Sequence, residues 1–215
     1  MMDGESLSLP YEYAVAGRAL AGERHSGDSA LVQPTARGVL AAVVDGLGHG
    51  AEAAAAAAAA IETLRKRSGE PVADLMRHCH ESLRGTRGAA LALASVEAAD
   101  NTLTWCGVGN IEAIVLTDPQ RPPRRNLALT NRAGVVGYRV PDVTATPVPI
   151  FPGDLLIMAT DGIDSRFVTE VSPWGKPDRL ARSILEGHGK TTDDQLVMVL
   201  RWLGPAATAG AAIAR

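Results

Sequence analysis

Three acidic sites lie at the ends of apolar, strand-like runs in this sequence. They are Asp45-Gly46, Asp161-Gly162 and Asp193-Asp194. If the runs are neighbouring strands, these carboxylates meet at one edge of the core. Such a cluster is unfavourable alone, because like charges in a partly dry site repel and favour protonation. Mg²⁺ or Mn²⁺ removes that cost through all-oxygen coordination, so the pattern favours a metal centre.

The chemistry of such a centre would be phosphoryl transfer to water. Two cations about 4 Å apart can activate a bridging water and hold a phosphoryl group during in-line attack. The glycines suit this role, because a residue without Cβ lets a main-chain carbonyl or a substrate come close to the metal. A single Asp-Gly after a strand is more often a simple turn. Its repetition, together with a third acidic pair, favours the metal interpretation.

A dinucleotide-binding loop is the sharpest competing interpretation. The run Gly46-Leu47-Gly48-His49-Gly50-Ala51 follows a strand, precedes a helix and nearly matches the G-x-G-x-x-G/A fingerprint. However, Asp45 would then face a pyrophosphate with no metal to offset the repulsion. The region around 65–67 also lacks the strand with a terminal acid that would bind the ribose. We therefore reject this interpretation.

Several polar residues near these turns have two interpretations. Asp28 could lie in the outer shell of the site and orient metal-bound water. His49 could approach the metals or a transferred proton, but satisfying backbone groups in its glycine-rich turn is the simpler expectation. Arg24 and His25 could meet a phosphate, and an exposed hairpin position is the simpler expectation for both, preferred for His25.

The elements that would position these residues follow from hydrophobic periodicity. Expected strands cover 11–20, 30–33, 38–44, 89–94, 103–108, 111–116, 134–140, 143–148, 155–159 and 196–202, with 30–33 pairing with 11–20. Expected helices cover 50–67, 71–84 and 177–186, the last ending at Gly187. The segment 117–126 reads as an exposed loop. Its Arg121, Arg124 and Arg125 could dock an acidic partner, although solvated positions are the simpler expectation.

This order of elements predicts an α+β domain. Strands grouped in hairpins, with helices inserted in blocks, are typical of layered antiparallel sheets. We expect one domain over residues 1–203, followed by an Ala/Gly-rich disordered tail over 204–215. The 215 residues are enough for one substantial core.

Composition limits the classes of partner. A formal net charge of -3 gives no electrostatic reason to expect nucleic acid or an anionic membrane. The two cysteines, Cys79 and Cys106, are too few for a disulfide framework.

The longest strictly apolar run, 53–61, is far below the roughly 18 residues that span a bilayer. The N-terminus does not have the features of a signal peptide. We expect a soluble, cytoplasmic protein.

Five glycine- and aspartate-containing segments follow one another in a fixed order: Ser26-Gly27-Asp28, Val44-Asp45-Gly46-Leu47-Gly48-His49-Gly50, Cys106-Gly107-Val108-Gly109-Asn110, Ala159-Thr160-Asp161-Gly162-Ile163 and Asp193-Asp194. In this order they resemble the metal-dependent protein phosphatase family (type 2C). The SpoIIE-type bacterial branch, and within it the short RsbX-like members, is the most similar. The resemblance extends from about 11 to 202.

The resemblance implies a four-layer αββα sandwich of two mainly antiparallel sheets, with two Mn²⁺ or Mg²⁺ ions at one end. Asp45 would bridge both ions and the Gly46 carbonyl would bind one of them. Asp161 and Asp193 would complete the other site, with Asp194 as the alternative to Asp193. Asp28 would act through water. Asp45, Asp161 and Asp193 are thus the expected catalytic residues.

The resemblance also implies a substrate class. RsbX-like proteins dephosphorylate phosphoserine or phosphothreonine on STAS-domain regulators of stressosome-type, partner-switching pathways. Two alternatives remain at this stage. The first is a phosphatase-fold protein that binds a signalling partner without catalysis. The second is another two-metal hydrolase such as a nuclease, which fits the carboxylates but not the acidic net charge.

Overall fold

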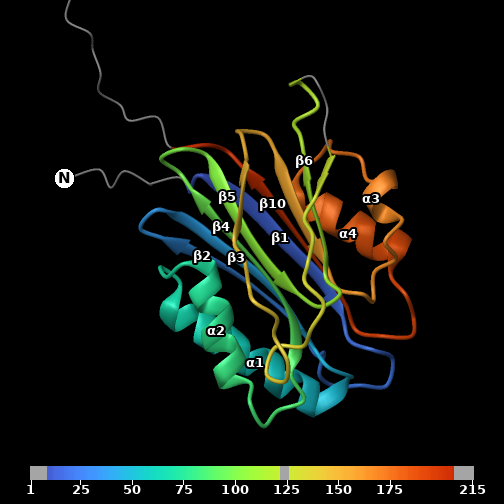
Figure 1. Cartoon of the computed structure of the whole chain (residues 1–215). Coiled ribbons are helices and arrows are strands. Elements are labelled where there is room, and N and C mark those ends of the chain that lie inside the picture. Colours follow the sequence, from blue (N-terminus) through green and yellow to red (C-terminus); the bar gives the residue numbers. More distant parts are fainter. Residues whose placement is uncertain (1–8, 122–125, 206–215) are drawn as a thin grey trace, which may run out of the picture.

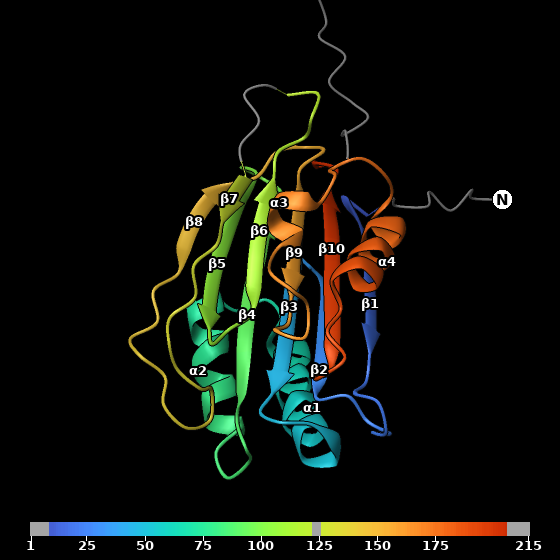
Figure 2. The ribbon, with the colours of Figure 1, turned by 90° about the vertical axis from the view of Figure 1, so that its right-hand side faces the viewer.

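The chain forms two packed antiparallel sheets with helices on both outer faces, an α+β sandwich. The computed structural model describes residues 9–121 and 126–205. Figure 1 shows α1 and α2 against one sheet, and α3 and α4 against the other. Figure 2 views the same sandwich from the side of α3 and α4, with the strands running side by side behind these helices. The predicted fold class is confirmed.

The first sheet has the strand order β2-β3-β4-β5-β8. Its strands are β2 (Asp28–Thr35), β3 (Gly38–Gly46), β4 (Ala89–Glu97), β5 (Thr102–Val108) and β8 (Thr146–Pro149). The central strands β3 and β4 are buried along nearly their whole length, which explains their continuous apolar sequences. They are covered on one face by helices and on the other by the second sheet.

The second sheet has the order β1-β10-β9-β6-β7. Its strands are β1 (Tyr11–Arg18), β10 (Gln195–Trp202), β9 (Leu155–Ala159), β6 (Glu112–Leu116) and β7 (Asn126–Ala128). The strands β9 and β10 are adjacent and antiparallel, with Val197 opposite Ala159. The end of β9 and the start of β10 therefore lie at the same end of the sheet.

Four helices cover the sheets within the described residues. They are α1 (Gly50–Arg67), α2 (Val72–Ser82), α3 (Phe167–Glu170) and α4 (Pro177–His188). The alanine run of α1 buries Ala53, Ala56, Ala57 and Ala60 against the first sheet. Small side chains let this helix lie close to the strand that carries Asp45.

Most sequence-predicted elements are present, but several predictions were wrong. The segment 30–33 does not pair with 11–20, because β1 pairs with β10 and β2 pairs with β3 in the other sheet. The segment 134–140 forms no strand and makes only isolated bridges, one between Val136 and Ala89 and one between Val135 and Arg139. Gly187 lies inside α4, and Gly189 follows the helix instead. A side chain at 189 would collide with Gln195 and with the main chain of α4.

The predicted disordered tail begins at Gly204, which the structure describes as buried against Pro152. The rest of the prediction, over 206–215, lies outside the described residues. Within the described part, no helix is long and apolar enough to span a membrane.

Asp154 organises the turn before β9. This side chain is only 2% exposed. Its carboxylate accepts hydrogen bonds from the main-chain N–H groups of Asp118 (2.8 Å) and Phe151 (2.9 Å) and from the Arg121 guanidinium (2.6 Å). The same guanidinium stacks 4.2 Å from the centre of the Phe151 ring. Arg121 is therefore part of the fold, whereas Arg124 and Arg125 lie outside the described residues.

We expect Asp154→Ala to lower the free energy of unfolding by about 2–4 kcal/mol, because it leaves buried donors and a guanidinium without their acceptor. Chemical denaturation measures the change. Glu186→Ala, at an exposed position of α4, is the control and should change stability by less than about 0.5 kcal/mol. Equal stability of the two variants would contradict this role of Asp154.

Candidate active site

Asp28 and Asp45 stand opposite each other on neighbouring strands. Asp28 is the first residue of β2, Asp45 is the penultimate residue of β3, and the two are directly paired in the antiparallel register. Side chains of such a pair point to the same face of the sheet, with Cβ atoms about 5 Å apart. Both residues are half-buried. Two carboxyl groups therefore share one end of the first sheet.

The second sheet brings further carboxyl groups to this end. Asp161 follows β9, and Asp193 and Asp194 precede β10. The Thr160 hydroxyl donates a 2.7 Å hydrogen bond to Asp28 Oδ2. This bond joins the two sheets at the aspartates, and the Leu196 N–H in turn donates to Thr160 Oγ1 at 3.0 Å.

The electrostatics show that these carboxyl groups act on one another. Burial, aided by the charges of Asp28, Asp161, Asp193 and Asp194, raises the pKa of Asp45 to about 8. Ionising this carboxyl group beside the other aspartates is therefore unfavourable without a compensating cation.

Asp28 and Asp161 respond in the same direction. Burial raises the pKa of Asp28 to about 7, against the opposing hydrogen bond from Thr160. Burial and the charge of Asp193 also raise the pKa of Asp161, while the Lys190 ammonium and the Asn110 amide oppose the rise. The Asn110 amide donates to Asp161 Oδ2 at 2.6 Å. Each of these aspartates is thus stabilised in part by a neutral donor or a cation.

Asp193 and Asp194 have different environments. Asp194 is 2% exposed. Its Oδ1 accepts the N–H of Leu20 at 2.8 Å, and its Oδ2 accepts the N–H of Gly27 at 2.7 Å. Asp193 is only half-buried, and its Oδ1 accepts the N–H of Asp194 at 2.8 Å. Asp194 therefore holds the β1–β2 loop, and Asp193 remains more open to the cluster.

The glycines after the aspartates allow close backbone contact. A Cβ at Gly46 would collide with the main-chain carbonyl of Ala53 in α1, and a Cβ at Gly162 would collide with the carbonyl of Asp194. The Gly162 turn thus packs directly on the segment that carries Asp193 and Asp194. Glycine at these positions keeps the aspartate turns close together.

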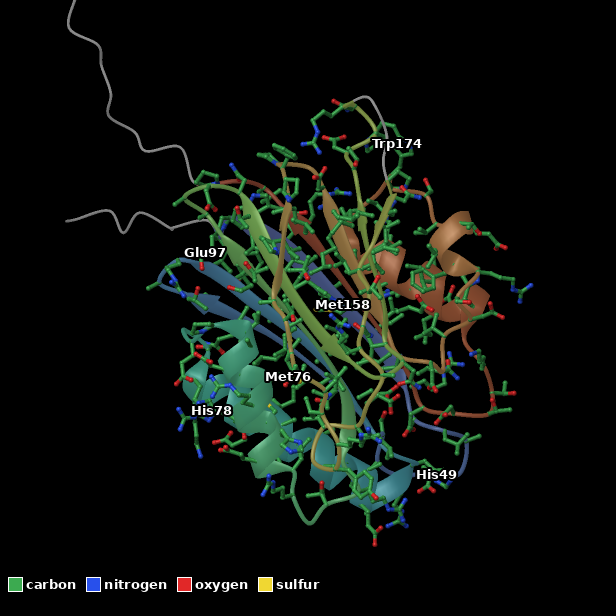
Figure 3. All side chains as sticks on the ribbon, viewed as in Figure 1. His49, Met76, His78, Glu97, Met158 and Trp174 are labelled. Carbon is green, nitrogen blue, oxygen red and sulfur yellow. The ribbon has the colours of Figure 1, made fainter. Side chains whose placement is uncertain are left out.

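The histidine and basic candidates lie at the surface. The His49 ring is hydrogen-bonded to the Glu23 carboxylate, with Nδ1 2.6 Å from Oε1, and its side chain makes no capping hydrogen bond to the helix that follows. The expectation that His49 satisfies backbone groups was therefore wrong. Figure 3 shows His49 at the edge of the molecule, beside the loop between β1 and β2. Arg24 and His25 are exposed on that loop.

Three residues that contact the aspartates were not identified from the sequence as site residues: Thr160, Asn110 and Lys190. Thr160 and Asn110 lie in the conspicuous strand-end motifs, so their position was a usable signal. Lys190 is an isolated lysine in a loop, and the pattern around it gave no signal.

The donor set fits a hard divalent cation by its chemistry. Carboxylates, with main-chain carbonyls at glycine turns, are the oxygen ligands of Mg²⁺ and Mn²⁺. Burial, and after it the charges of the other aspartates, raises the pKa values of Asp28 and Asp45, so these groups are costly to ionise here, and a cation would offset that cost. Across 9–121 and 126–205, however, no three acidic, histidine or cysteine side chains already stand together as ligands. The side chains would have to converge further when an ion binds.

Comparison with known proteins identifies a curated relative with a partial match. Phosphoserine phosphatase RsbX from Bacillus subtilis (strain 168) is 28% identical over 94 residues. The match covers 44% of this chain and 47% of that protein. The chain thus spans about half the length of this curated relative.

Solved structures share the fold over most of the chain. A structure from work on the bacterial stressosome as a modular system adapted to control secondary messenger signalling has a TM-score of 0.80 and 30% identity, covering 89% of this chain and 99% of that chain. The structure of RsbX in complex with magnesium has a TM-score of 0.79 and 20% identity, covering 89% of this chain and 94% of that chain. The PP2C phosphatase domain of SpoIIE from Bacillus subtilis, solved with a fragment of the regulatory domain, has a TM-score of 0.74 and 24% identity, covering 90% of this chain and 64% of that chain.

The resemblance inferred from the sequence motifs is confirmed at the level of the family. The model of the family described as stage II sporulation protein E (SpoIIE) matches residues 35–211, which is most of the sequence. The chain therefore belongs to the SpoIIE family of PP2C-type phosphatase domains.

Proposed function

We propose that this chain is a metal-dependent phosphatase that hydrolyses phosphoserine or phosphothreonine on a partner protein. The observation that carries the proposal is the set of mutually repelling carboxyl groups where the ends of the two sheets meet. Such a set is costly without cations and useful with them. Its occurrence in a member of the SpoIIE family supports the same activity.

The residues that would hold two Mg²⁺ or Mn²⁺ ions are Asp45, the Gly46 carbonyl, Asp161 and Asp193, with Asp28 acting through water. When bound, such ions lower the pKa of a coordinated water and stabilise the charge on a phosphoryl group. Thr160 and Asn110 orient the carboxyl groups of Asp28 and Asp161. The assignment of Asp193 in place of Asp194 rests on the two backbone N–H groups that already engage Asp194.

The proposed substrate is a phosphorylated STAS-domain regulator of a bacterial partner-switching pathway, in the cytoplasm. Two comparisons support this substrate class: similarity to phosphoserine phosphatase RsbX, and a stressosome-related structure at 30% identity over 89% of this chain. Binding of such a partner without hydrolysis is the alternative function. Mn²⁺ binding with no phosphate release would favour that alternative.

Removing the central carboxylate tests the activity. We expect Asp45→Ala to lower phosphate release from a phosphoserine peptide by at least about 100-fold in the presence of Mn²⁺, because loss of a metal ligand removes the activated water. A malachite-green assay measures the release, and Glu186→Gln is the charge-matched control. Turnover that is unchanged in Asp45→Ala would rule out the proposed centre.

The raised pKa values predict that the free energy of unfolding of the metal-free protein depends on pH. Between about pH 4 and pH 8 the folded chain keeps protons on Asp28 and Asp45 that the unfolded chain releases, so stability falls as the pH rises. Asp45→Asn removes part of this loss of stability. In EDTA it should therefore be more stable than wild type at pH 8.5, by on the order of 1–3 kcal/mol, with a smaller difference at pH 5.5.

Thermal unfolding at the two pH values measures this difference. Addition of Mn²⁺ should raise the Tm of wild type well above that of metal-free wild type, and should raise the Tm of Asp45→Asn much less. A wild-type chain that is more stable than Asp45→Asn in EDTA at pH 8.5 would contradict the electrostatic analysis.

Substitution of Asp193 should affect metal binding, and substitution of Asp194 should affect stability. Asp193→Asn should weaken Mn²⁺ binding at least about tenfold in calorimetry and leave the free energy of unfolding nearly unchanged. Asp194→Ala should instead lower that free energy by about 2–4 kcal/mol, because the buried N–H groups of Leu20 and Gly27 lose their acceptor. The reverse pattern would assign the ligand role to Asp194.

A further inference from the structure

A phosphorylated substrate must approach a strongly acidic site. A phosphate dianion near the five aspartates is repelled by them, and the repulsion is strong because the groups are partly desolvated. Metal ions offset part of that charge. A side-chain cation at the rim of the cluster would offset more and would also orient the phosphate oxygens.

Lys190 supplies a cation at this rim. Its Nζ donates a 2.6 Å hydrogen bond to the main-chain carbonyl of Asp161, while the residue as a whole is exposed. Its charge acts on the carboxyl groups of both Asp161 and Asp164. The ammonium group is therefore close to the cluster and open to solvent on its other side.

The backbone of Lys190 is fixed from two directions. Its N–H donates to the Gly162 carbonyl at 2.8 Å, and its own carbonyl accepts a hydrogen bond from the buried Gln195 side chain. The preceding Gly189 bridges to Ile163. The side chain thus starts from a defined point between the Asp161 turn and the Asp193 turn, and only its flexible stem has to move.

The basic residues considered from the sequence are placed less favourably. Arg24 and His25 are exposed on the β1–β2 loop, and the His49 ring is engaged by Glu23. The charge of Lys190 acts on the carboxyl group of Asp161, whereas none of these three residues contributes to the pKa shift of that group. Lys190 therefore has better evidence for a role at the site.

We propose that Lys190 binds the phosphoryl group of the substrate, and the inorganic phosphate product, by turning its ammonium from the Asp161 carbonyl toward a phosphate oxygen. The proposal rests on the phosphatase function proposed above. No bond is made or broken by Lys190, which acts through charge and hydrogen bonding. Its contribution should appear in substrate and product affinity more than in the rate of the bound complex.

Four variants of the Mn²⁺-loaded protein test the proposal. Lys190→Met removes the charge, Lys190→Arg keeps it, and Lys190→Gln keeps an N–H donor for the Asp161 carbonyl without charge. Lys66→Met is the matched control. Lys66 forms an ion pair with Glu62 near the far end of α1, roughly 24 Å along that helix from Gly50.

We expect Lys190→Met and Lys190→Gln to raise the KM for a phosphoserine peptide and the inhibition constant of inorganic phosphate about tenfold, with kcat changed less than about threefold. Lys190→Arg should stay within about threefold of wild type, as should Lys66→Met. If Lys190→Gln kept the wild-type KM and phosphate inhibition constant and Lys190→Arg did not, the role of Lys190 would be the hydrogen bond to the Asp161 carbonyl. That result would overturn the proposal.

Binding of inorganic phosphate, measured by calorimetry with Mg²⁺-loaded protein, gives a readout that does not need turnover. Weaker phosphate binding by Lys190→Met than by wild type supports the proposal even in an inactive protein. Equal binding by the two, or no binding by wild type, overturns it. Failure of the phosphatase function itself is seen separately, as equal phosphate release by wild type and Asp45→Ala.

Discussion

The structure depends on gathering like charges where the ends of its two sheets meet. Asp28 and Asp45 come from one sheet, and Asp161 and Asp193 lie at the adjoining end of the other. Burial and the charges of the neighbouring aspartates make it costly to ionise Asp28 and Asp45. The fold offsets part of this cost with neutral donors, above all the Thr160 hydroxyl on Asp28 and the Asn110 amide on Asp161. The carboxyl groups are thus held together at a cost that a cation would relieve.

Asp194 has a structural role in the fold, whereas the adjacent Asp193 has the proposed metal-binding role. Its buried carboxylate is engaged by two main-chain N–H groups from the β1–β2 loop, and this fixes the segment that leads into Asp28. The adjacent residue Asp193 lies in the same segment, but among the described residues its carboxylate accepts only the N–H of Asp194 and is not bound by the β1–β2 loop. Two adjacent aspartates can therefore serve different purposes, one structural and one directed at the proposed ions. The Gly162 turn, packed on Asp194, keeps both near Asp161.

Strand-end motifs made much of this architecture predictable. The apolar runs that end in Asp-Gly identified β3 and β9 and the aspartates beside them, because buried strands have a strong sequence signal. Strand partners were harder to predict, because the short apolar run at 30–33 predicts a strand but does not indicate which sheet that strand joins. Lys190 was missed for a similar reason. Its position depends on hydrogen bonds with Gly162, which is distant in the sequence, and with the side chain of Gln195, and these contacts leave no recognisable sequence pattern.

The central claim is that carboxyl groups from both sheets converge on shared cations. A crystal structure of the chain with Mn²⁺ tests it most directly. The account predicts two manganese ions at this end of the sandwich, with carboxylate oxygens of Asp45, Asp161 and Asp193 about 2.0–2.3 Å from them. Manganese bound elsewhere, with these three side chains pointing apart, would contradict it.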